Sequence, residues 1–434
     1  MKTAVVWHRN ILRIHDNPLL DMVHDKGHFD HVVPIYIVTP EALTEDYSVN
    51  RKRFLFQSLL DLKKNLDAHY KMPLLLLQGD VNQILSRVFE ALDSGEVELI
   101  CDYCTHPSRR TELANVESLI SEKADVSLTI VSSANTLLDI ETVVSSPSYT
   151  EPKSMKDMQK IFKRAFKSTS EHFNVPEPRK KVPNLPLVKR VSKKLSTDKK
   201  ISKHVLSEKK IASQLGKDSK EKSYFPGGES EALDRVDRKI SDNPAYINNF
   251  SKPSTVSTNE RNNPFEPTTT GLSAYLAAGC LSPRLVWRLC VNANLTGPHT
   301  KPPVSLTGQL MFREMFYLLS RSVENWDSDV GNSNCKNIEW DDLDKEKVRL
   351  WEEGKTGFPL IDAMMRQLDA TGWMHHLGRH AVSCFFTRGQ LWQNWKYGRD
   401  VFDRKLIDSD WALNNGNWLW LAGVAPFSMP YFRI

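Results

Sequence analysis

The sequence predicts two folded regions of different class, an α/β domain at residues 1–132 and an all-α domain at 224–434, joined by a long connector at 133–223. Three observations support this division. In the first region, short apolar runs alternate with helical stretches. The connector is interrupted by Pro and Ser and is thinly apolar. In the last region, apolar residues recur at helical spacing. Examples are Ile361, Met364, Met365 and Leu368.

Five apolar runs of the first region have the length of buried strands. Helical stretches at 53–66 and 81–92 lie between them, and strands that alternate with helices form a parallel sheet with right-handed crossovers. We therefore expect a Rossmann-like domain, whose default pocket is the crevice at the carboxyl ends of the strands. The predicted strands are Ala4–Trp7, Val32–Val38, Leu74–Leu77, Val97–Cys101 and Leu128–Val131.

The connector contains a strongly basic segment at residues 189–222. It holds 12 Lys/Arg against four Asp/Glu, whereas the formal net charge of the whole chain is only +5. The basic balance therefore comes from this segment and not from the folded domains. Such a run is expected to be solvated and disordered. The basic stretches at 178–181 and 189–194 also fit a nuclear import signal or a non-specific nucleic-acid tether.

Composition excludes several classes of protein. The chain has 434 residues, 40% of them hydrophobic, but no 18-residue apolar run, so no membrane span is expected. Only a short apolar stretch precedes His8, which argues against a secretory signal. The six cysteines are too few and too scattered for a disulfide framework, which indicates a reducing compartment.

The helical region opens at the Gly-Gly pair 227–228, after which Ala232, Leu233 and Val236 share one face of a predicted helix. The stretch 268–287, TTTGLSAYLAAGCLSPRLVW, places hydroxyls and a Gly before an apolar helix. Free backbone N–H groups and hydroxyls at a helix start can bind a phosphate, although such a pattern more often caps a helix. Further on, Gln309 and Arg313 lie four apart, on one helical face.

The segment 356–434 carries the most chemistry. It holds six of the 11 Trp residues, three histidines (His375, His376 and His380) and the acidic pair Asp408 and Asp410. His376 and His380 are four apart and therefore share a helical face. No Glu follows the first His as in H-E-x-x-H, and no third ligand stands at a diagnostic spacing, so no metal site is expected. Taken singly, each Trp is most simply explained as core packing.

Three ordered patterns of this segment, TGFPLIDA, GW-x-HHL-x-RHAV-x-CF-x-TRG and D-x-DW-x-x-N-x-GNW-x-W, resemble the FAD-binding domain of the photolyase/cryptochrome family. The similarity is greatest to the animal (6-4) DNA photolyases and animal cryptochromes. It is strong over 224–434, and WHRNILRIHDNPLL also resembles the family's opening motif. The resemblance implies an α/β domain that can hold an antenna chromophore of unknown identity, and a helical domain that binds FAD.

The resemblance also assigns the cofactor residues. It implies that the loop Thr269, Thr270, Gly271, Leu272 and Ser273 holds the FAD pyrophosphate, and that Gln309 and Arg313 face the flavin pocket. Arg379 and Asp408 match a buried pair against the flavin, and burial of either charge alone would be costly. Asp410 matches a residue at the flavin or its ribityl chain, and Asn414 matches the residue that faces flavin N5. His376 also touches the cofactor by this resemblance.

Two further groups follow from the resemblance. Trp418, Trp395 and Trp340 match the family's chain of tryptophans that relays electrons from the protein surface to the flavin. His376 and His380 match the histidine pair that (6-4) photolyases use for proton transfer to the lesion. Repair of a (6-4) photoproduct requires proton transfer together with an electron from excited FADH−. A histidine, whose pKa is ordinarily close to neutral pH, suits that proton transfer. Animal cryptochromes retain similar histidines, so repair and signalling both stay open.

We therefore expect an FAD-dependent, blue-light-driven (6-4) photolyase, a lyase whose partner is damaged DNA with the lesion flipped into a pocket. The alternative is an animal-type cryptochrome, a photoreceptor or circadian regulator that acts through clock or signalling proteins. A third reading is a flavin-free interaction protein. We further expect a nuclear or cytoplasmic monomer without membrane contact.

The sequence departs from the family at three places. Phe312 stands where the family usually has Trp, which keeps a stacking face but loses the indole N–H. His8 stands where an aromatic residue is usual. Family members also continue past Ile434 with further helices, so we expect an FAD-binding domain shortened at its C-terminus.

Overall fold

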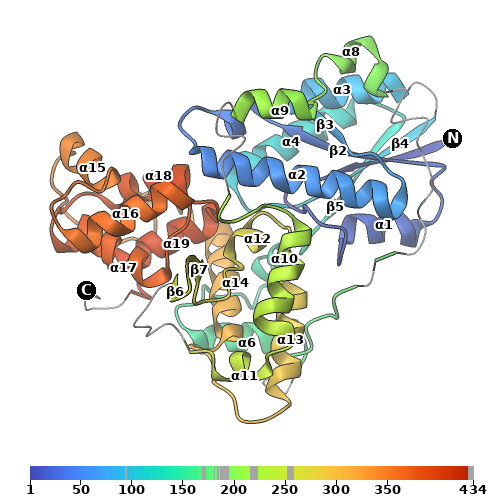
Figure 1. Cartoon of the computed structure of the whole chain (residues 1–434). Coiled ribbons are helices and arrows are strands. Elements are labelled where there is room, and N and C mark those ends of the chain that lie inside the picture. The colour runs from blue at the N-terminus through green and yellow to red at the C-terminus, as the bar shows by residue number, and fades with distance from the viewer. Residues whose placement is uncertain are drawn as a thin grey trace.

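The computed structural model describes residues 1–92, 95–168, 173–179, 181–182, 185, 195–215, 223–251 and 259–428. It contains a sheet domain and a larger helical part that lie side by side (Figure 1). The described parts of the connector pack against both. The predicted combination of an α/β domain with an all-α domain is confirmed.

The sheet has five parallel strands in the order β3-β2-β1-β4-β5. Each predicted strand is present, and the observed bounds differ from the predicted ones by at most two residues at either end. Helices lie on both faces of the sheet (Figure 1). The strands are β1 (Lys2–Trp7), β2 (His31–Val38), β3 (Leu75–Gln78), β4 (Glu96–Asp102) and β5 (Val126–Val131). The helices are α1 (Pro18–Lys26), α2 (Val49–Tyr70), α3 (Val81–Leu92) and α4 (Pro107–Ser121), with a 3-10 turn at Pro40–Leu43.

The continuous apolar runs of the strands follow from burial on both faces. In β1, Ala4 and Val6 join the core under α2, whereas Val5 and Trp7 join the core under α3 and α4. All four side chains are at most 1% exposed. A strand buried on both faces does not alternate polar and apolar residues, so a short apolar run was the correct signal for it.

His8, directly after β1, is fully buried. Its Nδ1 lies 3.0 Å from the Ile11 carbonyl oxygen, so Nδ1 carries the hydrogen and donates. Burial lowers the pKa of His8 to about 4, well below the usual value of a histidine. Between the usual pKa and about 4, the unfolded chain binds a proton that the folded chain does not bind. His8 therefore removes stability as the pH falls through this window.

We predict that His8→Phe makes the stability of the chain less sensitive to mild acid. A buried His that stays uncharged lowers the free energy of unfolding by about 1.4 kcal/mol for each pH unit that the pH lies below the usual pKa of histidine. Urea unfolding at pH 7 and pH 5 should show a smaller loss of unfolding free energy in the variant, by about 2 kcal/mol. Equal losses in both proteins would mean that His8 is already charged in the folded state.

The basic connector is more ordered than its composition predicted. Disorder was predicted for 189–222, but residues 195–215 are folded against the sheet domain. Val205 pairs with Leu77 of the edge strand β3, and the Leu206 amide donates to the Leu76 carbonyl. The prediction was wrong here because a few apolar side chains among the lysines are enough to anchor the segment. These are Leu195, Ile201, Leu206 and Ile211, each at most 3% exposed. Residues 189–194 and 216–222 lie outside the described residues.

The described connector contains short helices on both sides of the molecule. Helices α5 and α6 pack against the helical part, whereas α8 and α9 pack against α3 and α2 of the sheet domain. The bounds are α5 (Ile140–Val144), α6 (Met155–Ala165), α8 (Lys199–Ser202) and α9 (Glu208–Leu215).

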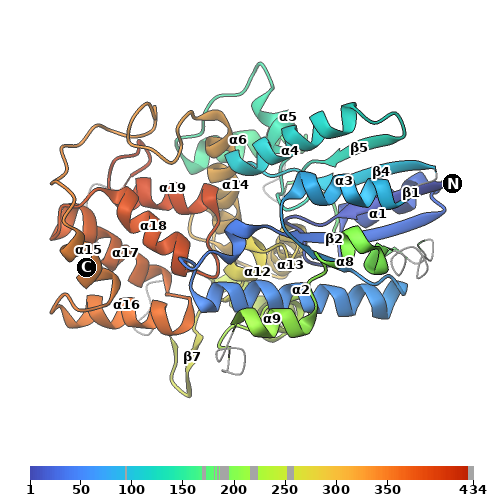
Figure 2. The ribbon, with the colours of Figure 1, turned by 90° about the horizontal axis from the view of Figure 1, so that it is seen from above.

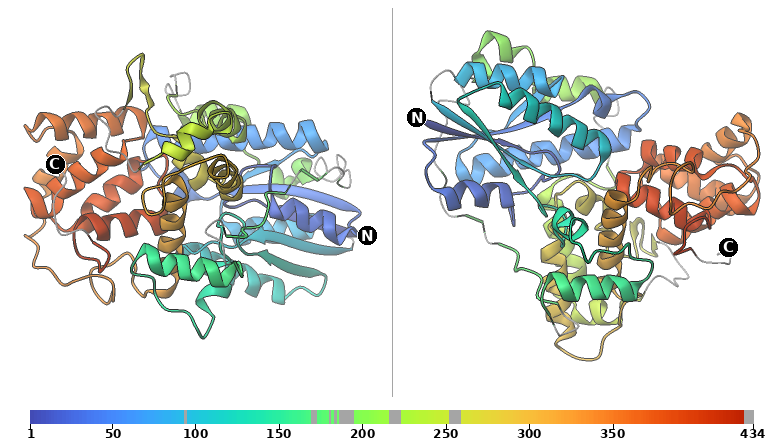
Figure 3. Two further views of the ribbon diagram at one scale, coloured as in Figure 1. Left: turned by 90° about the horizontal axis from the view of Figure 1, so that it is seen from below. Right: turned by 180° about the vertical axis from the view of Figure 1, so that it is seen from behind.

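The helical part is built around α14, which is central in all views (Figures 1 and 3). Helices α15–α19 form a group on one side, and α2 of the sheet domain reaches α18 in this group (Figure 2). The helices are α10 (Glu229–Val236), α11 (Pro244–Asn249), α12 (Ser273–Ala277), α13 (Pro283–Asn294), α14 (Leu306–Ser322), α15 (Lys345–Glu352), α16 (Pro359–Thr371), α17 (His376–Cys384), α18 (Trp395–Lys405) and α19 (Trp411–Leu421). Two π-helical turns, Asp237–Ser241 and Phe385–Gly389, and a hairpin of β6 (Asn259–Glu260) and β7 (Asn263–Pro267) complete it.

The two domains are joined by buried polar contacts. Asp16 binds the guanidinium of Arg284 through both carboxylate oxygens, at 2.7 and 3.0 Å, and also accepts from Ser282. Glu229 accepts from the Ile14 amide at 2.8 Å. At Gly279 the chains approach so closely that a Cβ would lie 1.8 Å from the Asn10 carbonyl oxygen. Within the described part of the chain, no helix is both long and apolar enough to cross a membrane.

Candidate functional site

A cavity of 330 Å³ lies between α12, α14, α17 and α19, the volume of a small-molecule site. The structure brings every residue predicted to bind the cofactor to its wall. Trp418 of the predicted relay lines it as well, whereas His380, Trp395 and Trp340 do not line it. The predicted residues that line it are Thr269, Thr270, Gly271, Leu272, Ser273, Gln309, Arg313, His376, Arg379, Asp408, Asp410 and Asn414.

The loop 269–272 offers free backbone donors to the cavity. Gly271 has φ +63°, in the left-handed region, and a Cβ there would come 2.8 Å from Nη1 of Arg235. Glycine is therefore required for this turn. Among the described residues, no backbone carbonyl accepts a hydrogen bond from the amides of 269–272. Amides grouped in this way bind anions such as phosphates.

An ion pair joins two walls of the cavity. Arg379 of α17 donates to both carboxylate oxygens of Asp408, at 3.1 and 2.8 Å, and its Nε donates to the Met374 carbonyl at 2.8 Å. The Asp408 side chain is only 3% exposed. The Ser273 hydroxyl donates to the same carboxylate at 2.6 Å. Because Asp408 is held by three donors, it fixes α12 relative to α17.

A second chain of contacts holds Asp410. The Tyr317 hydroxyl donates to Asp410 Oδ2 at 2.7 Å, and Asp410 Oδ1 caps α19 by accepting from the Leu413 amide. Arg313 lies over the Tyr317 ring and donates to its hydroxyl at 3.3 Å. Burial raises the pKa of Tyr317 well above its ordinary value, so the hydroxyl keeps its proton. The sequence analysis missed Tyr317, although it stands four residues after Arg313 on the same helix.

Asn414 of α19 is 9% exposed and lines the same cavity. Its Nδ2 donates to the Arg399 carbonyl at 3.0 Å. This contact fixes the orientation of the amide and leaves Oδ1 as the atom that can accept from a ligand.

The predicted histidine pair is in place at the start of α17. His376 lines the cavity, and its Nε2 lies 2.9 Å from Nε2 of His380, which is 3% exposed. At this distance one nitrogen donates and the other accepts, so the pair shares one hydrogen. Trp420 packs against both rings, with centroids 6.2 Å from His376 and 4.9 Å from His380. The pair is therefore fixed at the cavity wall with a proton between its two rings.

The third histidine has a structural role. His375 is fully buried and caps α17, because its Nδ1 accepts from the Leu377 amide at 3.2 Å. Burial and then the neighbouring Arg379 lower the pKa of His375 to about 4. A neutral ring is what the cap requires, since a protonated Nδ1 could not accept.

The three tryptophans of the predicted relay lie at different depths in the protein. Trp418 lines the cavity, and the fully buried Trp395 begins α18, which packs against the helix of Trp418. Trp340 is half-buried and contacts Trp392, with ring centroids 5.3 Å apart. Trp392 is 40% exposed and was missed in the sequence, where only its place three residues before Trp395 could have indicated it. Trp351 adds a buried edge-to-face contact to Trp418 at 6.3 Å.

A second cavity of 750 Å³ opens at the carboxyl ends of the sheet strands, the crevice predicted for this domain. Its wall combines aromatic residues such as Tyr36 and Phe54 with polar and charged ones such as Arg9, Asn82 and Arg109. His106 lines it and contacts Trp411 of α19 at 5.2 Å, so this cavity lies close to the helical part.

Two family models match the chain. Residues 4–183 match the model described as DNA photolyase, and residues 305–434 match the FAD binding domain of DNA photolyase. The (6-4)DNA photolyase of Arabidopsis thaliana is 36% identical over 440 residues, covering 96% of this chain and 73% of that protein. Cryptochrome-1 of Sylvia borin is 35% identical over 434 residues, covering 99% of this chain and 66% of that protein.

Solved structures share the fold. A cryptochrome from Synechocystis sp. PCC6803 aligns with a TM-score of 0.78 at 21% identity, covering 100% of this chain and 84% of that one. An archaeal photolyase from Sulfolobus tokodaii, solved with two FAD molecules, aligns with a TM-score of 0.71 at 22% identity, covering 100% and 85%.

Proposed function

Because this chain belongs to the photolyase/cryptochrome family, we propose that it repairs (6-4) pyrimidine photoproducts in DNA with blue light. FAD is its cofactor, and in the reduced, light-excited state FAD supplies the electron for repair. The observation that carries the proposal is the histidine pair at the wall of the FAD cavity, with the two Nε2 atoms 2.9 Å apart.

The residues of the cavity fit FAD. The amides of 269–272 suit its pyrophosphate, because they offer several donors to one anion and no backbone carbonyl of the described residues accepts from them. Asn414 Oδ1 and the indole of Trp418 offer an acceptor and an apolar face to the flavin. The paired Arg379 and Asp408 put no uncompensated charge beside it.

We predict that Asp408→Asn weakens FAD retention about tenfold, the scale of one charge-assisted hydrogen bond. Asparagine keeps the shape but leaves Arg379 without its counter-charge. FAD affinity is read from the flavin fluorescence released on dilution. Asp369→Asn is the control, because Asp369 pairs with Lys405 but is 70% exposed. Equal retention in the two variants would remove Asp408 from the cofactor site.

In the proposed reaction, His376 moves the proton. His376 lines the cavity, so a proton carried by its ring can pass to the hydroxyl that returns to its parent base. His380 Nε2 accepts or donates in turn and sets the tautomer of His376. Phe312 lines the same cavity and offers a flat face to a flipped base.

We assign the reduction of FAD to the tryptophans. Trp418 stands at the cavity, Trp395 behind it, and Trp340 passes the oxidising equivalent to the exposed Trp392. A chain that ends at an exposed ring can be reduced by an external donor. The 750 Å³ cavity of the sheet domain is the proposed place of a second, light-harvesting chromophore.

One observation favours a second function. The chain is as similar to cryptochrome-1 as to the (6-4) photolyase, at 35% and 36% identity. The alternative proposal is therefore a cryptochrome that binds FAD and acts through protein partners in light signalling or the clock.

Light-dependent repair separates the two functions. Purified, flavin-loaded protein is mixed with a duplex that carries one (6-4) photoproduct and is kept in blue light or in darkness. Chromatography of the digested DNA reports the lesion. Repair in light alone supports the photolyase, whereas an unchanged lesion with bound, photoreducible FAD supports the cryptochrome.

A further inference from the structure

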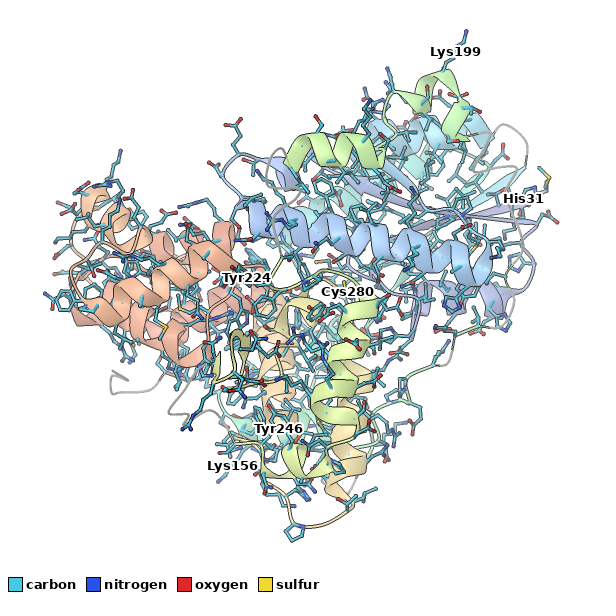
Figure 4. The ribbon with its side chains drawn as sticks, viewed as in Figure 1. His31, Lys156, Lys199, Tyr224, Tyr246 and Cys280 are labelled. Atoms are coloured by element: carbon cyan, nitrogen blue, oxygen red, sulfur yellow. The ribbon has the colours of Figure 1, made fainter. Side chains whose placement is uncertain are left out.

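Helix α6 and the residues just beyond its two ends carry a dense row of cations. Residues 153–167 contain six Lys/Arg and a single acidic residue, Asp157. All six cationic side chains are exposed. Lys156 projects from the molecule at the end opposite to Lys199 of α8 (Figure 4). The cations are Lys153, Lys156, Lys160, Lys163, Arg164 and Lys167.

Few of these cations pair with other groups of the protein. Lys160 pairs with Asp157 at 3.3 Å, and Arg164 donates to the Ser148 carbonyl. Lys156, Lys163 and Lys167 pair with no acidic side chain among the described residues. Cations at the end of a helix can stabilise its dipole, which accounts for Lys163, but Lys156 stands in the first turn, where a cation opposes the dipole. Stability of α6 therefore does not explain the row.

The inner face of α6 is already occupied. Met158, Ile161 and Phe162 are at most 8% exposed and belong to the core that α6 forms with α14. A basic amphipathic helix that binds a membrane needs a free apolar face, and this helix has none to offer. What remains is a surface for a polyanion that contacts the cations alone.

The distance between the lysines matches a multiple of the distance between phosphates along a nucleic acid. At 1.5 Å rise per residue, Lys156 and Lys163 are about 10 Å apart along the helix. One strand of a DNA duplex carries a charge about every 3.4 Å along its axis, so these lysines span about three phosphates.

The row is also within reach of a duplex bound at the FAD cavity. Helix α6 packs against α14 and crosses it (Figure 3), and Gln309 and Phe312 of α14 line the cavity. Packed helix axes are about 8–10 Å apart, and a helix with side chains is about 10 Å wide. The cations therefore lie roughly 20 Å from the cavity, which is less than one turn of DNA, about 34 Å.

We propose that the outer face of α6 and the turn that follows it, with Lys156, Lys163 and Lys167 as the main contacts, bind the phosphodiester backbone of the duplex that flanks the lesion. This inference rests on the proposed repair function. Phosphate contacts position the duplex but carry no information about the lesion, so this face contributes affinity and salt dependence and no lesion preference.

The test compares two triple variants of the flavin-loaded full chain. One carries Lys156→Gln, Lys163→Gln and Lys167→Gln. The matched control carries Lys199→Gln, Lys203→Gln and Lys209→Gln, which removes three exposed lysines from the opposite end of the molecule. Fluorescence anisotropy gives the dissociation constant for a lesion-containing and an undamaged duplex at several salt concentrations, and bound FAD reports folding.

We expect the α6 variant to reduce the slope of log affinity against log salt by about 2 to 3, at about 0.9 for each lost phosphate contact. The ratio of the affinities for damaged and undamaged duplex should stay constant, and the control should keep the wild-type slope. An unchanged slope in the α6 variant, an equal loss in the control, or a lost lesion preference would overturn the proposal. A reduced slope in a chain that binds but does not repair would uphold this surface and reject the repair function.

Discussion

Replacing His376 or His380 with alanine should lower the rate of (6-4) repair at least about 100-fold, the usual contribution of general acid–base catalysis. His376 faces the cavity and carries the proton to be transferred, whereas His380 holds the ring of His376 through the 2.9 Å contact between the two Nε2 atoms. If one of the two rings is missing, the hydroxyl that returns to its parent base would have to receive its proton from water. The measurement is repair per absorbed photon in a duplex with one defined lesion.

His375 provides the matched control for this pair. Its Nδ1 caps α17, and asparagine is a good replacement at an N-cap, so His375→Asn should keep both the helix and the repair rate. FAD content should survive in His380→Ala, because His380 does not line the cavity. Near-normal repair in both alanine variants would refute the catalytic assignment of the pair.

Replacing Trp418 with phenylalanine should abolish nearly all photoreduction of bound FAD by an external donor. Trp418 is the relay residue that lines the cavity, and it is 1% exposed, so no donor in solution can replace it at that place. Phenylalanine keeps much of the packing but is far harder to oxidise than an indole. The measurement is the rate at which the spectrum of oxidised FAD disappears under blue light in the presence of a thiol.

Trp326→Phe controls for the loss of a buried indole as such. Trp326 is also 1% exposed, but its Nε1 donates to the Ala412 carbonyl and it does not line the cavity. This variant should be photoreduced at the rate of the unchanged protein. If Trp418→Phe is photoreduced as fast as Trp326→Phe, the tryptophans are core residues and the relay assignment is wrong.

The sequence predicted the sheet and most of the cavity because their signals are local. Apolar runs such as Val32–Val38 are typical of strands buried on both faces of a parallel sheet, and β2 is such a strand. The spacing of Gln309 and Arg313 placed both on one face of a helix, and both line the cavity. The helical spacing of His376 and His380 likewise predicted their contact.

The remaining features depend on tertiary contacts that local patterns do not contain. Tyr317 matters through its hydrogen bond to Asp410, which is 93 residues away in the chain. Trp392 matters through Trp340, which belongs to another segment. The order of 195–215 comes from pairing with the edge strand β3, so its charged composition was a misleading guide. In each case a distant partner decides the role of the residue.

The most direct test of the proposed function is a competition between two lesions in one sample. Flavin-loaded protein is illuminated with a mixture of duplexes, one with a (6-4) photoproduct and one with a cyclobutane dimer, and both lesions are quantified over time. We predict that the (6-4) photoproduct disappears with light dose while the cyclobutane dimer persists, because His376 and His380 supply the proton transfer that only the first lesion requires. Repair of the cyclobutane dimer alone, or of neither lesion while FAD remains bound and photoreducible, would contradict the assignment of this chain as a (6-4) photolyase.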